Sequence, residues 1–237
     1  GLLVMPVLFN RWHNPHLDYG GIYIDHFLPQ GAWAGRQFSQ RNAAYLEAVV
    51  APHADDPRIL AWDLCNEPFS YDASAEGMGD IVEAEYDWLH SFYDQCKDLG
   101  VEVPITVGTH MGISLEQVEP ISDVLSIHPY WRYGEDKVPF ERMLDDYVAF
   151  SARVGKPLLA TETCWGSLDD AKRVEIIRYT LGELKKRDIG WLVYLLHHSL
   201  IADAHRPAFG PVGDPGNLAF IEADGTLRPG HEVFNAF

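Results

Sequence analysis

Basic residues, cysteine and long apolar runs are all scarce in this sequence. The 237 residues include 18 Lys and Arg against 35 Asp and Glu, so the formal net charge is −17. Proteins that bind nucleic acids or anionic membranes do so through positively charged surfaces, so we expect neither partner. No run of about 18 apolar residues occurs, which argues against a transmembrane helix. The acidic balance favours solubility and identifies no partner by itself.

The three cysteines, Cys65, Cys96 and Cys164, are too few for a disulfide framework. Their spacing matches no zinc motif, and free cysteine is among the most often buried residue types, so we expect buried thiols. The chain starts at Gly1 in an apolar run that has no signal-peptide pattern. Neither feature separates a cytoplasmic from a secreted protein, so the compartment stays open, as does the oligomeric state.

Apolar segments of strand length recur along the chain, and most of them are continuous rather than alternating. Continuous runs are typical of strands that are buried on both faces, as in parallel sheets. The predicted strands are Leu2–Phe9, Ile59–Cys65, Pro104–Gly108, Val124–His128, Pro157–Thr161 and Trp191–Leu196.

Helical periodicity fills the intervals between these strands. Helices are predicted over Ser39–Val50, Ile81–Leu99, Leu115–Val118 and Phe140–Phe150, and after Ser167. Ser167 is a candidate N-cap of the last helix, whose final turn carries basic residues that complement the helix dipole. Its buried face is expected to hold Val174, Ile177, Leu181 and Leu184. Trp62 and Trp88 are assigned to the core.

The alternation of strands and crossover helices predicts parallel βαβ units and the α/β fold class. We expect a TIM (β/α)8-type barrel that forms a single domain over residues 1–237, with six of its units visible. A barrel of this type typically needs about 250 residues, so the length fits. The long loop at Arg11–Phe38 takes up part of that length.

Two glutamates follow predicted strands directly. Glu67 lies in the segment Asn66-Glu67-Pro68 after one strand, and Glu162 ends another. In parallel α/β folds, side chains at the C-terminal ends of strands face the active site. Glycoside hydrolysis needs one carboxyl to protonate the leaving oxygen and a second to attack the anomeric carbon or to activate water. The pair therefore favours a glycosidase.

An ordered set of three motifs is similar to that of the clan A retaining glycoside hydrolases. The motifs are Asn66-Glu67-Pro68, His128-Pro129-Tyr130 and Glu162, each after an apolar strand. The closest resemblance is to glycoside hydrolase family 5, the family of cellulases and mannanases. It covers essentially the whole chain and implies a β-glycosidase that acts by double displacement on a glucan or a mannan, without a cofactor.

The resemblance also assigns roles to individual residues. Glu67 would be the general acid/base and Glu162 the nucleophile. Asn66 would bind the sugar 2-hydroxyl, Tyr130 would hydrogen-bond the nucleophile, and His128 would line the same subsite.

Trp131 and Trp165 are candidate stacking platforms, because aromatic rings suit the apolar face of a sugar.

The sequence departs from this family at three places. The resemblance puts Glu67 on strand four, so Leu2–Asn10 becomes strand three, the first two units are missing, and we expect further N-terminal sequence. Strand eight has no tryptophan at its end, because Trp191 lies too early, and His197 or His198 is expected at the edge of the site. At the end of strand three, where the family carries a histidine, the candidates are Asn10, Arg11, Trp12 and His13.

Two other functions stay open at this point. Histidines crowd the predicted loops, and with nearby aspartates they could hold a metal in a TIM-barrel hydrolase. These residues are His13, His16, His26, His110, His128, His197, His198, His205, Asp18, Asp25 and Asp203. No tight His-x-His or His-Glu-x-x-His pairing occurs among them, so we expect no metal. The second alternative is a carbohydrate-binding barrel without catalysis, since a fold alone does not guarantee function.

Overall fold

A computed structural model describes residues 1–11, 43–69, 81–196, 218–222 and 224–237. The described chain divides into two compact units, one ending at Leu125 and the other beginning at Ser126. Helices alternate with strands along the whole of the described chain, as the sequence predicts. The assignment of residues 1–237 to one barrel domain stays a prediction.

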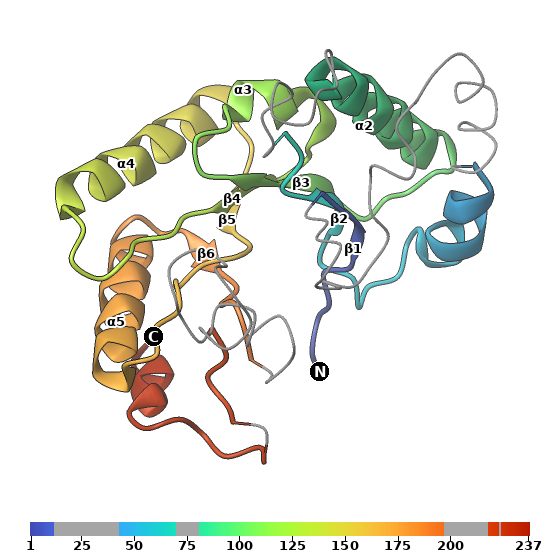
Figure 1. Ribbon diagram of the computed structural model, residues 1–237. Helices are drawn as coiled ribbons and strands as arrows, with labels where there is room; N and C mark the ends of the chain where they lie inside the picture. The colour runs from blue at the N-terminus through green and yellow to red at the C-terminus, as the bar shows by residue number, and fades with distance from the viewer. Residues whose placement is uncertain (12–42, 70–80, 197–217, 223) are drawn as a thin grey trace. The chain divides into compact units, whose positions relative to one another are not determined.

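The first unit is built on three parallel strands, β1 (Val7–Asn10), β2 (Trp62–Asn66) and β3 (Ile105–His110), which are neighbours in that order (Figure 1). In the register of β1 and β2, Asn10 lies opposite Asn66. The first four residues of β2 and the first five of β3 are all buried. Burial of consecutive residues, which point to opposite faces, confirms that these strands are covered on both sides.

Helices cover this sheet through an aromatic cluster. The first helical segment spans residues 43–49 and leads into the 3-10 turn η2 (Ala51–His53), while α2 spans Ile81–Asp98. The Phe9 ring of β1 packs at 4.7 Å from Trp88 and 5.0 Å from Phe92 of α2, both edge to face. Trp62 and Trp88 are buried, as predicted. The helix α3 (Leu115–Val118) and the turn η3 (Glu119–Ile121) complete this unit.

The second unit contains all but the first residue of β4 (Leu125–His128), together with β5 (Leu158–Ala160) and β6 (Gly190–Trp191) and the helices α4 (Lys137–Val154) and α5 (Asp170–Lys186). Strands β5 and β6 are parallel, with Leu159 opposite Gly190. A Cβ at Gly190 would lie 2.9 Å from the end of the Leu159 side chain, so a larger residue at this position would displace that side chain. The turn η5 (His231–Ala236) packs against α5 (Figure 1).

Two expectations for this unit need correction. The strand predicted over Trp191–Leu196 ends at Trp191, because β5 itself ends at Ala160 and offers no further regular ladder. The N-cap of α5 is Asp169 rather than Ser167. The Asp169 carboxylate accepts hydrogen bonds from the N–H groups of Ala171 and Lys172, while the Ser167 hydroxyl accepts one from the N–H of Asp169. Both residues thus serve the turn, and the carboxylate has the better position.

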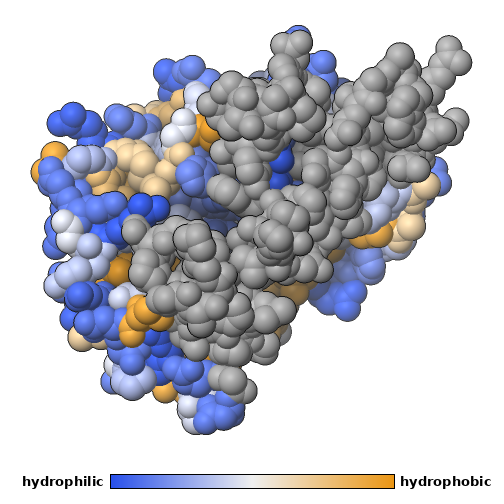
Figure 2. Space-filling view, in the orientation of Figure 1, coloured by the Kyte–Doolittle hydropathy of each residue, from blue (hydrophilic) through white to orange (hydrophobic). Residues whose placement is uncertain are grey.

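Two composition-based expectations can be compared with the structure. Cys65, Cys96 and Cys164 are buried free thiols, and burial raises the pKa of Cys164 to about 12. Within the described part of the chain, none of the helices combines the length and the apolar character that crossing a bilayer demands. Hydrophilic residues predominate where α4 and α5 lie at the left of the view (Figures 1 and 2).

Candidate active site

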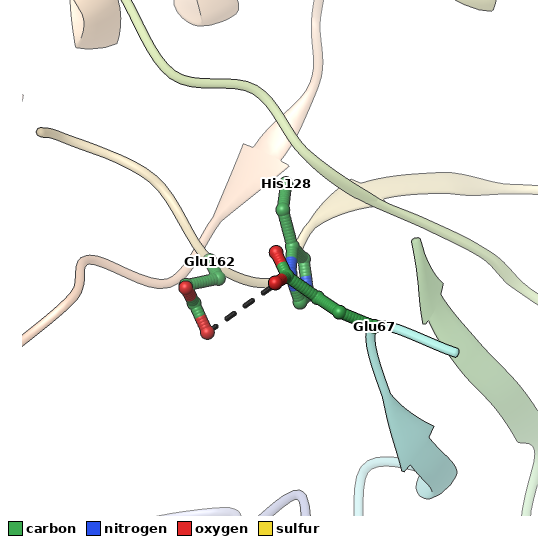
Figure 3. A group of neighbouring side chains, drawn as sticks. All are labelled: Glu67, His128 and Glu162. Atoms are coloured by element: carbon green, nitrogen blue, oxygen red, sulfur yellow. Dashed lines mark ion pairs between the residues drawn. The ribbon is translucent and has the colours of Figure 1, made fainter. Parts of the chain in front are cut away.

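Glu67 lies directly after β2, on backbone that turns sharply at the C-terminal end of the strand (Figure 3). Its N–H donates to the Gly108 carbonyl of β3 at 2.9 Å, and the residue is 5% exposed. Glu67 and Phe69 adopt left-handed backbone with φ of 51° and 65°. For residues other than glycine this conformation costs about 1 kcal/mol or more, so surrounding contacts must maintain the turn.

A buried ion pair stabilises this turn. The carboxylate of Glu85, on α2, accepts a hydrogen bond from the Phe69 N–H at 2.8 Å and pairs with the Arg11 guanidinium. The Arg11 N–H in turn donates to the Asn66 carbonyl at 3.0 Å. Both charged side chains are at most 3% exposed. Arg11 was one of several candidates for a substrate residue, and Glu85 was not singled out, although its place on the buried stripe of α2 was a usable signal.

A second buried carboxylate shapes the end of β2. Asp63 Oδ1 accepts hydrogen bonds from the N–H groups of Cys65 at 3.1 Å and Gly108 at 3.0 Å. The register between β2 and β3 shifts between Asp63 and Asn66. Such irregularities bend a strand and redirect its next side chains. Asp63 therefore helps to set the direction in which Asn66 and Glu67 leave the sheet.

The two asparagines predicted to contact substrate lie side by side at the ends of β1 and β2. Asn66 Nδ2 donates to Asn10 Oδ1 at 3.2 Å. Both residues are partly exposed, so their amide groups keep capacity for further hydrogen bonds. The first unit thus groups Asn10, Asn66 and Glu67 at one end of its sheet.

In the second unit, Glu162 follows β5 with its side chain 21% exposed. The phenol of Tyr130, after β4, donates a hydrogen bond to Glu162 Oε1. The other oxygen, Oε2, lies 3.9 Å from Nδ1 of His128 at the end of β4 (Figure 3). Hydrogen bonds to a carboxylate stabilise its ionised form, which is the form able to act as a nucleophile. The three residues that the sequence grouped here do lie together.

Hydroxyl groups fix the side chains and backbone around Glu162. Thr161 Oγ1 lies 3.1 Å from His128 Nε2 and also contacts the Ser126 hydroxyl. Thr163 Oγ1 donates to the Pro129 carbonyl at 2.5 Å. Hydrogen bonds therefore join the segments after β4 and β5 on both sides of Glu162.

The two predicted stacking tryptophans differ in their surroundings. Trp165 is half-buried, with its ring 5.2 Å from that of Tyr130 and the Arg132 guanidinium 4.8 Å from its centre. Trp131 is 2% exposed, packs at 4.6 Å from Tyr179 and donates from Nε1 to the Glu135 carbonyl at 3.2 Å. A buried ring has no open face for a sugar, so Trp131 is a packing residue and only Trp165 is kept as a platform.

Several predicted residues lie outside the described residues, namely His13, His197 and His198. The same holds for most of the histidines and for all the aspartates considered as metal ligands. His110 is described, and its Nδ1 lies 2.7 Å from the Met111 carbonyl. In the second unit, His128 and Glu162 present an imidazole nitrogen and a carboxylate oxygen to each other, which are the ligand types that bind zinc and related ions.

Known enzymes resemble the chain in sequence. No protein-family model matches it. It is 25% identical over 112 residues to the mannan endo-1,4-beta-mannosidase A of Podospora anserina, which is 46% of this chain and 27% of the relative. It is 28% identical over 95 residues to a probable mannan endo-1,4-beta-mannosidase A of Aspergillus oryzae, which is 38% of this chain and 23% of the relative.

Solved structures resemble the chain over most of its length. A family GH2 beta-galacturonidase from Eisenbergiella tayi matches with a TM-score of 0.63 and 17% identity, over 85% of this chain and 36% of that one. A beta-glucuronidase from Lactobacillus rhamnosus matches with a TM-score of 0.62 and 17% identity, over 90% and 36%. The chain spans less than half the length of each of these four proteins.

These comparisons confirm the resemblance to clan A glycosidases that the motifs indicated. The sequence relatives are family 5 mannosidases and the structural neighbours are family 2 enzymes, and both families are TIM-barrel glycosidases. They also confirm the fold class, with six parallel strands alternating with helices as a partial α/β barrel. The chain therefore resembles glycoside hydrolases in sequence and in fold.

Proposed function

We propose that this protein is a retaining β-glycoside hydrolase, with Glu162 as the nucleophile and Glu67 as the general acid/base. The observation that carries the proposal is the environment of Glu162. Its carboxylate is held by the Tyr130 phenol and lies beside His128, at the C-terminal end of a strand. A carboxylate fixed in direction and only partly exposed is suited to attack on an anomeric carbon.

The reaction proceeds in two displacements. In the first, a Glu162 oxygen attacks the anomeric carbon, the glycosidic C–O bond breaks, and Glu67 gives its proton to the leaving oxygen. In the second, Glu67 takes a proton from water as the water attacks the same carbon, and the bond to Glu162 breaks. The configuration at the anomeric carbon is retained, and both glutamates return to their initial states.

Neighbouring groups would bind the sugar. Asn66 would hydrogen-bond the 2-hydroxyl, a contact that strengthens as the transition state forms. Trp165 would stack on the apolar face of the ring. Tyr130 and His128 would keep Glu162 oriented. Because Asn10 and Asn66 contact each other, replacement of either should disturb the other.

For the substrate we propose a β-linked glycan of the mannan or glucan type, in line with the two mannosidases that share sequence with the chain. A β-uronoside is a second candidate. It is favoured by the solved structures, which include a beta-galacturonidase and a beta-glucuronidase, and by the Arg132 cation beside Trp165. A guanidinium can form two hydrogen bonds with the carboxylate of a uronoside, whereas a neutral sugar has no carboxylate.

The test is covalent trapping with 2-deoxy-2-fluoro glycosides that carry activated leaving groups, in the manno, gluco and glucurono series. We expect one glycosyl adduct per chain, mapped to Glu162 by peptide mass spectrometry, and the series that reacts identifies the sugar. Glu162→Gln should give no adduct, and Glu175→Gln, an exposed glutamate of α5, should label like the parent.

Other outcomes would select the alternatives. An adduct on another residue would overturn the assignment of the nucleophile. Hydrolysis that a chelator abolishes, without any adduct, would indicate a metal-dependent hydrolase. Carbohydrate affinity without turnover or adduct would indicate a binding protein.

A further inference from the structure

Arg173 on α5 is fully buried, which is unusual for an arginine. Among the described residues, the hydrogen-bond partners of its guanidinium are four main-chain carbonyl oxygens. Nη1 donates to Cys164 and Trp165, while Nη2 donates to Tyr194 at 3.1 Å and to Leu218 at 2.9 Å. One guanidinium thus satisfies carbonyls from three separate segments of the second unit.

The first of these segments is the turn that carries the proposed nucleophile. Glu162 stands two residues before Cys164, and Cys164 has left-handed backbone with a φ of 73°. On the other side of Glu162, the Thr161 N–H donates to the Ile127 carbonyl of β4 at 3.1 Å. The backbone of Glu162 is therefore fixed by β4 at one end and by Arg173 at the other.

We propose that Arg173 is a positioning residue, which sets the direction of Glu162 by binding the carbonyls of Cys164 and Trp165. The inference rests on the proposed function, because the effect of misdirecting Glu162 is measured as a rate of glycosyl transfer. A buried carbonyl left without a donor is unfavourable, so loss of the guanidinium would let the turn move toward other donors. The turn could then leave the left-handed conformation, and Glu162 would move with it.

The charge of Arg173 persists under ordinary conditions. Burial lowers its pKa to about 10, and the side chain is still protonated near neutral pH. Four carbonyl dipoles directed at the guanidinium compensate its burial. Lysine would keep the charge, but its single nitrogen cannot reproduce the planar fork that reaches carbonyls on several sides.

Arg228 offers a matched control in the same unit. It is 3% exposed, and it donates to the carbonyls of Ala219 at 2.7 Å and Ser167 at 2.9 Å and to the Asp170 carboxylate at 2.9 Å. Its replacement should also destabilise the unit. It anchors the start of α5 and the C-terminal segment, whereas Arg173 binds the turn beside Glu162.

The experiment compares Arg173→Lys with Arg228→Lys under conditions in which both are folded. Inactivation by the 2-fluoro glycoside that labels the parent gives a maximal rate constant, kinact, and a half-saturation concentration, KI. We expect kinact to fall by about 100-fold for Arg173→Lys, the size associated with displacing a reacting group by about 1 Å. KI should change less than kinact, and Arg228→Lys should change kinact by less than about threefold.

Two further measurements separate positioning from general destabilisation. Glycine adopts the left-handed conformation without strain, so adding Cys164→Gly to Arg173→Lys should recover part of kinact even if it lowers the melting temperature. Hydrogen exchange in the peptide that covers residues 161–166 should be faster in Arg173→Lys than in Arg228→Lys. If Arg173→Lys does not fold, Arg173→Gln, whose amide keeps two N–H donors, takes its place.

The outcomes distinguish this inference from the proposed function. If the parent labels at Glu162 and both lysine variants lose kinact equally, the positioning role of Arg173 is wrong. If the parent does not label, the proposed function fails, and equal exchange in the two variants would overturn the positioning role independently.

Discussion

Tyr130 donates its phenolic hydrogen to Oε1 of Glu162, across the gap between the segments that follow β4 and β5. The two side chains are far apart in sequence and meet because β4 and β5 end at the same edge of their sheet. Tyr130 itself is 7% exposed and packs against Trp165. Packing therefore fixes the Tyr130 ring, and the hydrogen bond from its phenol orients the Glu162 carboxylate.

The first prediction concerns this hydrogen bond. Tyr130→Phe keeps the packed ring and removes the donor to Glu162. A hydrogen bond to a charged group contributes about 1.5–3 kcal/mol, so we expect kcat to fall by about 10- to 100-fold. Tyr133→Phe, which changes a tyrosine that is 47% exposed, is the control. Equal rates in Tyr130→Phe and the parent would show that the bond does not assist Glu162.

The second prediction concerns Glu67. Glu67→Ala removes the proton donor, so hydrolysis of substrates with poor leaving groups should slow by about 100-fold or more, while activated aryl glycosides should react in the first step almost normally. Azide, which needs no general base, should then speed turnover and yield a β-glycosyl azide. Glu102→Ala, at an exposed position of the same unit, should behave like the parent in both assays. An equal loss on both kinds of substrate would contradict the acid/base role.

The sequence predicts the position of a site residue where neighbouring residues in the chain mark it. Glu67 and Glu162 each follow an apolar run directly, so their places at strand ends could be predicted. The partners of Arg11, Glu85 and Arg173 could not be predicted in the same way. Each meets its partners through the fold, and a charged helical residue such as Arg173 is ordinarily assigned to the solvent face. Trp131 shows the converse, because a tryptophan near a site motif looks the same in sequence whether its ring is open or buried.

Helix ends illustrate a finer limit of the sequence. Ser167 and Asp169 can both cap α5, and the choice depends on which side chain reaches the free N–H groups of the first turn. The structure shows that Asp169 does so. Because both are good N-cap residues and stand two positions apart, the sequence leaves the start of α5 uncertain by two residues.

The third prediction concerns the ion pair behind Glu67. Glu85→Gln leaves the Arg11 charge buried without its full counter-charge, and breaking a buried pair in this way costs about 3–5 kcal/mol. We expect a loss of that size in urea unfolding, while Glu83→Gln, at an exposed position of the same helix, should change stability by less than about 0.5 kcal/mol. The double variant Arg11→Met/Glu85→Leu removes both charges and should recover part of the stability. Its failure to exceed Glu85→Gln would show that the charges are not the cause.

The fourth prediction concerns the pH dependence that arises from Asp123 in the first unit. Asp123 Oδ2 accepts hydrogen bonds from Lys97 Nζ at 2.6 Å and from the Ile105 N–H at 2.8 Å, and Oδ1 accepts one from the Tyr93 phenol at 3.1 Å. Partial burial favours the neutral acid, but these donors outweigh it and lower the pKa of Asp123 below its ordinary value of 3.8. Burial and the neighbouring charge of Asp123 raise the pKa of Tyr93 to about 12.

A carboxylate whose pKa is lowered by folding stabilises the native state above its unfolded pKa and loses that contribution as the pH falls through the folded value. Asp123→Asn should therefore cost about 1 kcal/mol near pH 7, since the group is partly exposed to solvent. The cost should stay constant down to about pH 5 and shrink below about pH 4. Urea unfolding at several pH values measures this difference, with Asp98→Asn, an exposed change at the end of α2, as the control. A difference that does not change with pH would mean that the geometry of the hydrogen bonds, and not the charge of Asp123, ties α2 to the start of β3.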